Sequence, residues 1–115
     1  MELNTINKKV GDIYWLTSKG EIAHPHVIIH IDDIDGLITL CSITTNMRKL
    51  NMPGNILLNI GEGNLKELSI VEVTKELSVN SSQLNKYIGS LSLERINEII
   101  NGINFVNKSF LNNHI

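Results

Sequence analysis

Three histidines close together in the chain are the first candidates for chemistry. His24, His26 and His30 share one parity in a stretch that is typical of a β-strand, so alternation would place them on one face. His26 and His30 are four residues apart, about 13 Å along a regular strand, which is too far for one metal ion. His24 and His26 could cooperate, but a metal would then need ligands from elsewhere. The sequence therefore predicts no metal site.

His24 has a second interpretation because it immediately precedes Pro25 at the start of that strand. Proline restricts the preceding residue to extended geometry, which would hold the imidazole at the rim of the sheet. Imidazole titrates near neutrality, as a general acid or base must. The alternative for His24 is a surface histidine without a catalytic role, and the alternative for His30 is a half-exposed strand residue.

A polar loop after an apolar strand candidate offers a second cluster. It contains Thr44, Thr45, Asn46, Arg48 and Lys49, and no acidic residue interrupts it. Hydroxyls and amides donate hydrogen bonds to phosphate oxygens and base edges, and a guanidinium can bind phosphate through two donors. An ordinary polar turn is the alternative interpretation of this loop.

Composition limits the class of protein. The chain has 115 residues, which predicts one domain over 1–115, and its 42% hydrophobic and 19% charged content excludes intrinsic disorder. The net charge of −2 counts against a nucleic-acid-binding role without excluding a local basic patch. The lone cysteine, Cys41, fits a reducing compartment. No signal peptide or membrane-spanning run is evident, so we expect a cytoplasmic protein.

The elements that must position these residues follow from periodicity. Short apolar or alternating runs bounded by turn residues predict five strands, over 10–16, 24–31, 37–43, 55–60 and 69–79. The run Asp32–Gly36 predicts a turn between the second and third strands. The last strand alternates apolar and polar residues, which is typical of a strand with one solvated face.

The period changes to that of a helix after residue 92. Apolar residues recur at helical spacing from Leu93 onward, Ser92 stands at the N-cap position, and Glu94 lies in the first turn. Gly102 inside this helix indicates close packing against a neighbour. A short helical turn is expected near 82–87. Together these elements predict a mostly β protein, a small antiparallel barrel or strongly bent sheet with a C-terminal helix.

Taken in order, several segments resemble the MazF/PemK family of toxin endoribonucleases from type II toxin–antitoxin modules. The resemblance spans about residues 9–110 and rests on the order and spacing of Gly11–Trp15, His24–Ile29, Cys41–Asn46, Met52–Asn55, Leu68–Val71 and Leu84–Ser92.

The resemblance implies an SH3-like barrel, a homodimer, and cleavage of single-stranded RNA without a metal or other cofactor. It also implies a cognate antitoxin protein, because a groove that holds extended RNA can also be occupied by an acidic segment. Family members have an Arg–Pro pair at the start of the second strand and a threonine after the third strand. The threonine corresponds to Thr44, whereas the arginine position holds His24.

The resemblance and the chemistry of the reaction suggest roles for the candidate residues. Attack by a 2′-hydroxyl needs a base, an acid for the leaving 5′ oxygen, and donors for the phosphorane. We assign His24 as general acid or base and Thr44 as donor to the scissile phosphate. Contacts to the RNA are predicted for Lys19, His26, Thr45, Asn46 and Arg48.

Two other functions compete with a ribonuclease. The first is a catalytically degenerate family member that binds RNA or an antitoxin through the same groove. The second is a structural or regulatory barrel that binds no nucleic acid. Strongly salt-dependent RNA binding would distinguish the ribonuclease and the binding module from the structural or regulatory barrel.

Overall fold

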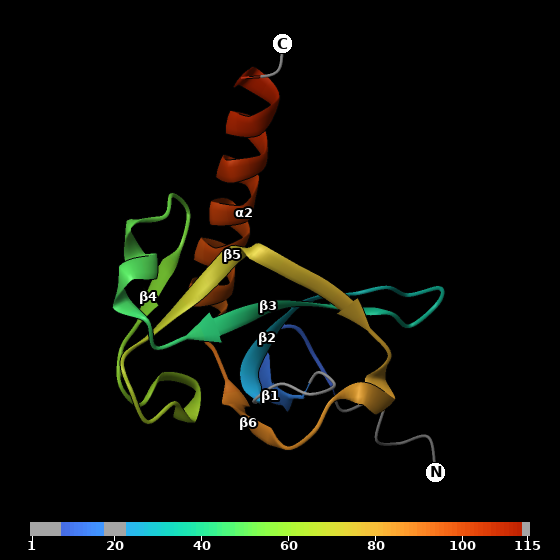
Figure 1. Ribbon diagram of the computed structural model, residues 1–115. Coiled ribbons are helices and arrows are strands. Elements are labelled where there is room, and N and C mark those ends of the chain that lie inside the picture. The colour runs from blue at the N-terminus through green and yellow to red at the C-terminus, as the bar shows by residue number, and fades with distance from the viewer. Residues whose placement is uncertain (1–7, 18–22, 114–115) are drawn as a thin grey trace.

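A computed structural model describes residues 8–17 and 23–113. Six strands form one antiparallel sheet in the order β4-β5-β3-β2-β1-β6, which curls strongly, with a single long helix at the C-terminal end (Figure 1). This confirms the mostly β class. The strands are β1 (Asp12–Leu16), β2 (His24–Ile31), β3 (Ile38–Thr44), β4 (Ile56–Leu58), β5 (Ser69–Val79) and β6 (Tyr87–Ser90), and the helices are η1 (Met47–Asn51), η2 (Glu62–Asn64), η3 (Ser81–Gln83) and α2 (Leu93–Asn113).

Hydrophobic side chains pack on both faces of the curled sheet. One cluster joins alternate residues of the strands to the α2 side, and includes Ile13, Val27, Cys41, Ile43, Val71 and Ile99. The second cluster uses the other parity, and includes Tyr14, Leu16, Ile28, Leu40 and Val79. Because β1, β2 and β3 contribute to both clusters, they read as nearly continuous apolar runs in the sequence.

The alternation predicted for the last strand is interrupted in β5. Cys41 pairs with Glu76 while the next residue, Ser42, pairs with Glu72, so three residues of β5 have no partner on β3. This irregularity bends β5, leaving Glu72 buried at 8% exposed and Leu77 exposed at 36%. The prediction of one uniformly solvated face was therefore wrong.

A second irregularity changes the face on which His30 lies. Ile28 pairs with Leu40 and His30 pairs with Thr39, so β2 has one extra residue at this point. Ile28 and Ile31 consequently both pack against the second cluster, which places His30 on the opposite face from His26. The prediction that all three histidines share one face was wrong for His30.

The other strands differ from expectation mainly at their ends. β2 and β5 have the predicted bounds, whereas β1 begins at Asp12 rather than residue 10 and β4 covers only Ile56–Leu58. The helical turn expected near 82–87 is a 3-10 turn over Ser81–Gln83. It is followed by β6, a sixth strand that pairs with β1 and was not predicted.

The C-terminal helix begins as predicted. The Ser92 hydroxyl accepts the Arg95 backbone N–H at 3.2 Å. A Cβ on Gly102 would collide with the carbonyl oxygen of Gly54, and a Cβ on Gly54 would lie 2.8 Å from the Gly102 carbonyl oxygen. This contact confirms the close packing inferred for Gly102.

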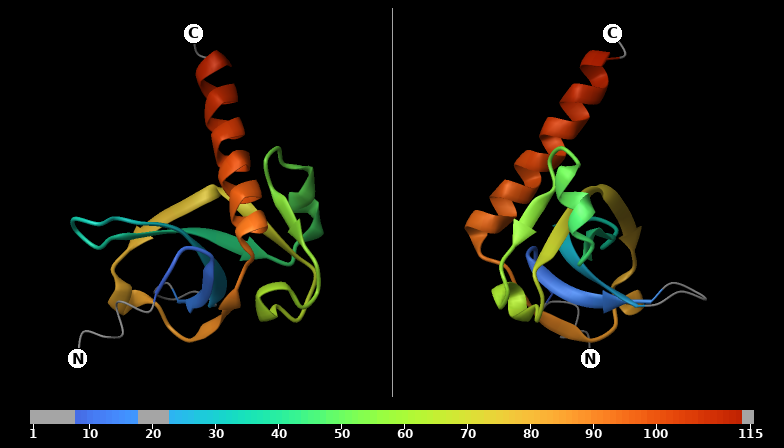
Figure 2. Two further views of the ribbon diagram at one scale, coloured as in Figure 1. Left: turned by 180° about the vertical axis from the view of Figure 1, so that it is seen from behind. Right: turned by 60° about the vertical axis from the view of Figure 1, so that its left-hand side comes forward.

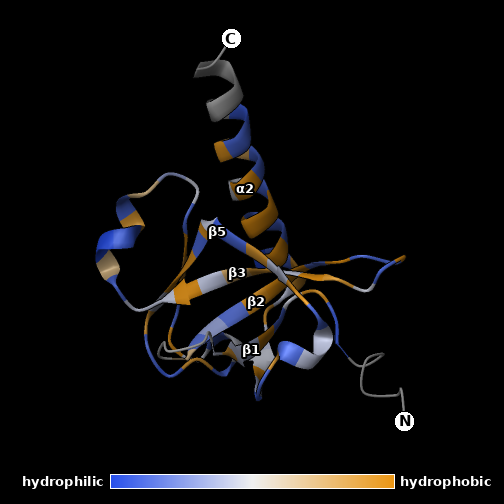
Figure 3. Ribbon diagram, turned by 45° about the vertical axis from the view of Figure 1, so that its right-hand side comes forward, coloured by the Kyte–Doolittle hydropathy of each residue, from blue (hydrophilic) through white to orange (hydrophobic). Residues whose placement is uncertain are grey.

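The second half of α2 extends beyond the sheet (Figures 1 and 2), and hydrophobic and hydrophilic residues alternate along the helix (Figure 3). None of the helices in the described ranges is long and apolar enough to cross a membrane.

Candidate functional site

A groove of about 590 Å³ opens where the start of β2 and the end of β3 meet the segments around η2 and β6. Trp15, Pro25, Ile43 and Ile88 supply apolar surface, and hydroxyl and charged residues surround them. The residues that line it are Trp15, Ala23–Pro25, Ile43–Thr45, Asn64–Glu67, Ser69 and Lys86–Ile88. The lining therefore combines apolar and aromatic surface with hydroxyl and charged side chains.

The two residues predicted to be catalytic lie at this groove. Antiparallel pairing of His26 with Ser42 and of Val27 with Cys41 places the start of β2 beside the end of β3. His24 lies two residues before His26, and Thr44 lies two residues after Ser42. His24, the exposed first residue of β2, and Thr44, the last residue of β3, accordingly line the same groove.

The hydroxyl of Thr44 is held by the loop that follows it. Its Oγ1 accepts a hydrogen bond from the Asn46 backbone N–H at 3.1 Å. A hydroxyl has one hydrogen to donate and two lone pairs, so accepting this bond leaves the Thr44 O–H free to donate. Such a donor can bind an anionic oxygen in the groove.

His26 supports the start of β2 rather than lining the groove. It is 7% exposed, and its Nδ1 donates to the carbonyl oxygen of His24 at 3.0 Å, because a carbonyl can only accept. Burial lowers the pKa of His26, and the backbone hydrogen bond at His24 and the charge of Glu72 oppose this shift only in part. A neutral imidazole with its proton on Nδ1 therefore holds the His24 backbone in place.

The remaining predicted contacts have different positions. Thr45 lines the groove, whereas Asn46, Arg48 and His26 do not. The Asn46 side chain caps η1 by accepting the Arg48 backbone N–H at 3.1 Å. Lys19 lies outside the residues that the structure describes.

Two lysines at the groove were missed by the sequence analysis. Lys66 follows η2 and Lys86 precedes β6, and both are exposed and line the groove. They are far from His24 and Thr44 in the sequence, and no spacing connects them with those two residues. The aromatic residues Trp15 and Tyr87 also contribute, from β1 and β6.

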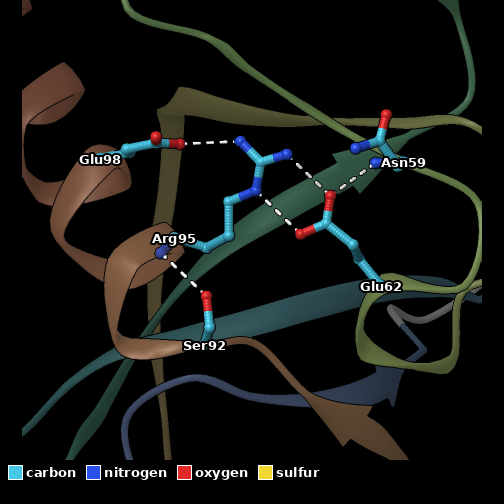
Figure 4. Close-up of polar contacts among 5 residues, drawn as sticks. All are labelled: Asn59, Glu62, Ser92, Arg95 and Glu98. Carbon is cyan, nitrogen blue, oxygen red and sulfur yellow. Dashed lines mark hydrogen bonds and ion pairs between the residues drawn. The ribbon is translucent and has the colours of Figure 1, made fainter.

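The wall that carries Lys66 is fastened by an ion-pair cluster (Figure 4). Arg95 of α2 donates from Nε and Nη2 to the two carboxylate oxygens of Glu62, each at 2.8 Å. Glu62 also accepts the Asn59 backbone N–H at 2.7 Å, and Arg95 donates to Glu98 at 2.8 Å. Hydrogen bonding to Arg95 holds the pKa of Glu62 below its usual value. The segment 59–67 is thus fixed to the start of α2.

Within the described residues, no group of three or more His, Cys, Asp or Glu side chains is arranged to hold a metal ion. The charged side chains at the groove are Lys66, Glu67 and Lys86, with His24 beside them. Lysines therefore outnumber carboxylates at this place, although the whole chain has a net charge of −2.

Comparison with known proteins gives one family and several similar folds. A family model described as the PemK-like, MazF-like toxin of type II toxin–antitoxin systems matches residues 9–106. No curated protein sequence matches the chain significantly. An endoribonuclease from a mycobacterial species, solved in complex with its cognate antitoxin, superimposes with a TM-score of 0.70 at 16% identity, over 84% of this chain and 90% of that one.

The toxin MazF-mt6 of Mycobacterium tuberculosis is also similar, with a TM-score of 0.66 at 18% identity, over 80% of this chain and 91% of that one. A further mycobacterial endoribonuclease has a TM-score of 0.66 at 16% identity, over 84% and 88%. At these identities the superpositions establish a shared fold.

Proposed function

Because this chain belongs to the PemK-like, MazF-like toxins of type II toxin–antitoxin systems, with the family model matching residues 9–106, we propose that it is an endoribonuclease that cleaves single-stranded RNA. The observation that carries the proposal is the groove that His24 and Thr44 line together with two lysines. An imidazole, a hydroxyl donor and cationic side chains are the groups that phosphodiester transesterification requires.

The proposed reaction uses the RNA's own 2′-hydroxyl. His24 accepts the proton of that hydroxyl as its oxygen bonds to phosphorus, and the bond from phosphorus to the 5′ oxygen breaks. A proton returns to the leaving 5′ oxygen, so the products are a 2′,3′-cyclic phosphate and a 5′-hydroxyl. The free O–H of Thr44 donates to a non-bridging oxygen as negative charge develops on the phosphorane.

Mass spectrometry of the products tests this reaction directly. A defined single-stranded RNA is incubated with the protein in EDTA, and the new ends are identified. We expect a 2′,3′-cyclic phosphate and a 5′-hydroxyl, formed at the same rate with and without EDTA. Ends with a 3′-hydroxyl and a 5′-phosphate, or cleavage that EDTA abolishes, would contradict the proposed mechanism.

The second candidate function is an RNA- or antitoxin-binding module without catalytic activity. The observation in its favour is His24, which stands where family members have arginine. Salt-sensitive RNA binding together with intact RNA after long incubation would support the binding module and contradict the ribonuclease.

We also propose the partners and location that such a toxin requires. A cognate antitoxin would occupy the same groove as RNA, and one of the similar folds is an endoribonuclease in complex with its antitoxin. The RNA substrate implies a cytoplasmic location. A homodimer is further proposed because η1 and the residue after it leave Met47, Leu50 and Met52 about 40% exposed. Sedimentation equilibrium should give twice the 12.9 kDa mass of one chain.

A further inference from the structure

We propose that Lys66 and Lys86 form a pair of contacts to RNA backbone phosphates, which makes the groove locally basic in an acidic protein. The inference rests on the proposed function for the identity of the ligand and adds the residues that hold its backbone. Neither lysine is among the candidate residues identified from the sequence, although Lys86 lies within Leu84–Ser92, one of the segments that carry the resemblance.

The backbone of Lys86 is hydrogen-bonded to that of Trp15, and both residues line the groove. The backbone N–H of Trp15 donates to the carbonyl oxygen of Lys86 at 2.9 Å, and the Asn85 N–H donates back to Trp15 at 2.9 Å. Trp15 itself is 37% exposed and lines the groove. A groove lined by a cation and an exposed indole suits a single-stranded nucleic acid, whose phosphates bind cations while its bases stack on aromatic rings.

Lys66 is held next to the same segment from the other side. The Asn64 side chain donates from Nδ2 to the carbonyl oxygen of Ile88 at 3.0 Å. A Cβ on Gly89 would collide with the Gly63 carbonyl, so the two backbones are in direct contact. The ion pair of Glu62 with Arg95 then fastens this segment to α2. The backbones that carry both lysines are therefore positioned before any ligand arrives.

The charges of these lysines are available to a ligand. Neither ammonium group forms an ion pair with a carboxylate of the described residues. Glu67 is the single carboxylate among the residues that line the groove. By contrast, Lys49, which the sequence placed in the candidate polar loop, lies 3.9 Å from the carboxylate of Glu72.

The test measures how salt affects binding of a short 2′-O-methyl RNA of mixed sequence. This probe lacks the attacking hydroxyl and cannot be cleaved by the proposed reaction, so binding is measured apart from catalysis. Emission of Trp15, the chain's one tryptophan, reports occupancy of the groove. The variants are Lys66→Gln, Lys86→Gln and their combination, with Lys75→Gln as the control, because Lys75 is exposed on β5 away from the groove.

Each phosphate contact on a single strand adds about 0.7 to the slope of log affinity against log salt, or about 2.6-fold between about 50 and 200 mM. We expect the slope of each single variant to fall by one such increment and that of the double variant to fall by two. Between about 50 and 200 mM salt, the double variant should therefore lose roughly sevenfold less affinity than wild type loses. Lys75→Gln should keep the wild-type slope.

A slope in the double variant equal to that of wild type would overturn the proposal, as would a wild-type protein that does not bind the probe. Lysine variants that lose affinity for an acidic peptide but not for the RNA would also overturn it and indicate a site for protein. If wild type binds in the expected way but leaves an unmodified RNA intact, the lysine pair stands and the proposed ribonuclease activity fails. If wild type cleaves RNA and the slopes of the lysine variants equal that of wild type, the proposed ribonuclease activity stands and the lysine pair fails.

Discussion

At the scale of single residues, the site depends on His24 and the backbone that carries it. The imidazole of His24 is exposed, while its carbonyl oxygen accepts the hydrogen bond from buried His26. The side chain can therefore change without loss of that contact. This separation of the proposed catalytic side chain from its structural backbone makes His24 a suitable target for mutation.

We predict that His24→Ala reduces the rate of RNA cleavage by about 10²- to 10⁴-fold, the usual contribution of a general acid or base. The melting temperature should stay unchanged, because alanine keeps the carbonyl that His26 holds. His30→Ala is the matched control, since His30 is exposed on the same strand but does not line the groove. Cleavage by His24→Ala at the wild-type rate would remove this residue from the mechanism.

At the scale of elements, the groove depends on segments that are fixed to one another by a few strong contacts. Glu62 and Arg95 join the segment after β4 to the start of α2 (Figure 4). Both side chains are partly buried, at 26% and 21% exposed, so this bidentate pair is less screened than a surface ion pair. A second contact is the close backbone approach of Gly54 and Gly102, which joins the segment before β4 to the middle of α2.

The Glu62–Arg95 pair predicts a pH dependence of stability. Because hydrogen bonding to Arg95 lowers the pKa of Glu62 in the folded state, its contribution is fully present above the ordinary value of 4.5 and is lost as the pH falls below it. The free energy of unfolding of Glu62→Gln should therefore be about 1–2 kcal/mol lower than that of wild type at neutral pH, and this difference should shrink in acid.

Urea unfolding at several pH values measures this effect, with Glu67→Gln as the control in the same segment. Glu67 is exposed and forms no ion pair with the described residues. A difference between wild type and Glu62→Gln that is equally large at all pH values would exclude an ionic contribution.

The Gly54–Gly102 contact predicts that Gly102→Ala will destabilise the protein, although alanine normally favours a helix. Alanine is better than glycine inside a helix by up to about 1 kcal/mol, but its Cβ at position 102 meets the Gly54 carbonyl oxygen. We expect Gly102→Ala to lower the free energy of unfolding by about 1–3 kcal/mol, as overpacking does. Asn101→Ala, at the exposed neighbouring position, should be neutral or stabilising. A stabilised Gly102→Ala protein would show that the helix can move away.

At the scale of the whole molecule, the two hydrophobic clusters bury the central residues of β2 and β3 on both faces of the sheet. Cys41 lies in the centre of this arrangement, fully buried in the cluster on the α2 side. Burial, with the charge of Glu76, raises the pKa of its thiol to about 12. The reactivity of Cys41 thus reports on opening of the sheet as a whole.

We predict that native Cys41 reacts with a thiol-specific disulfide reagent only through unfolding. At pH 8 a thiol with this pKa is almost entirely protonated, and the thiolate is the reactive form. The labelling rate should rise with urea in parallel with the unfolded fraction measured by circular dichroism. Labelling of the native chain at the rate of the fully denatured chain would contradict this packing.

The net charge of the chain does not describe the charge at the groove. The total of −2 disfavours binding of nucleic acid, yet the groove is bordered by Lys66 and Lys86 while Glu62, Glu72 and Glu98 pair with cations elsewhere. For the proposed RNA ligand, charges at the groove matter more than the net charge, because at about 0.1 M salt the charges more than about 10 Å away are largely screened.

The sequence by itself determined the class of fold, the bounds of β2 and β5, and the start of α2. Residue periodicity and capping are local properties, so the long strand over Ser69–Val79 and the start of α2 could be read from them. The pairing of His24 with Thr44 as candidate residues came from the resemblance to the toxin family, and the groove that both residues line is a feature of the tertiary structure.

Only the tertiary structure determined the extra residue that moves His30 to the other face, the sixth strand, and the place of Lys66 and Lys86 at the groove. A bulge and a four-residue edge strand depend on the partner strand, which a local pattern does not contain. The two lysines are brought together by pairing of β6 with β1 and by contacts between η2 and β6. Contacts between residues distant in sequence decided these features, because side chains without a shared local period meet only when the chain is folded.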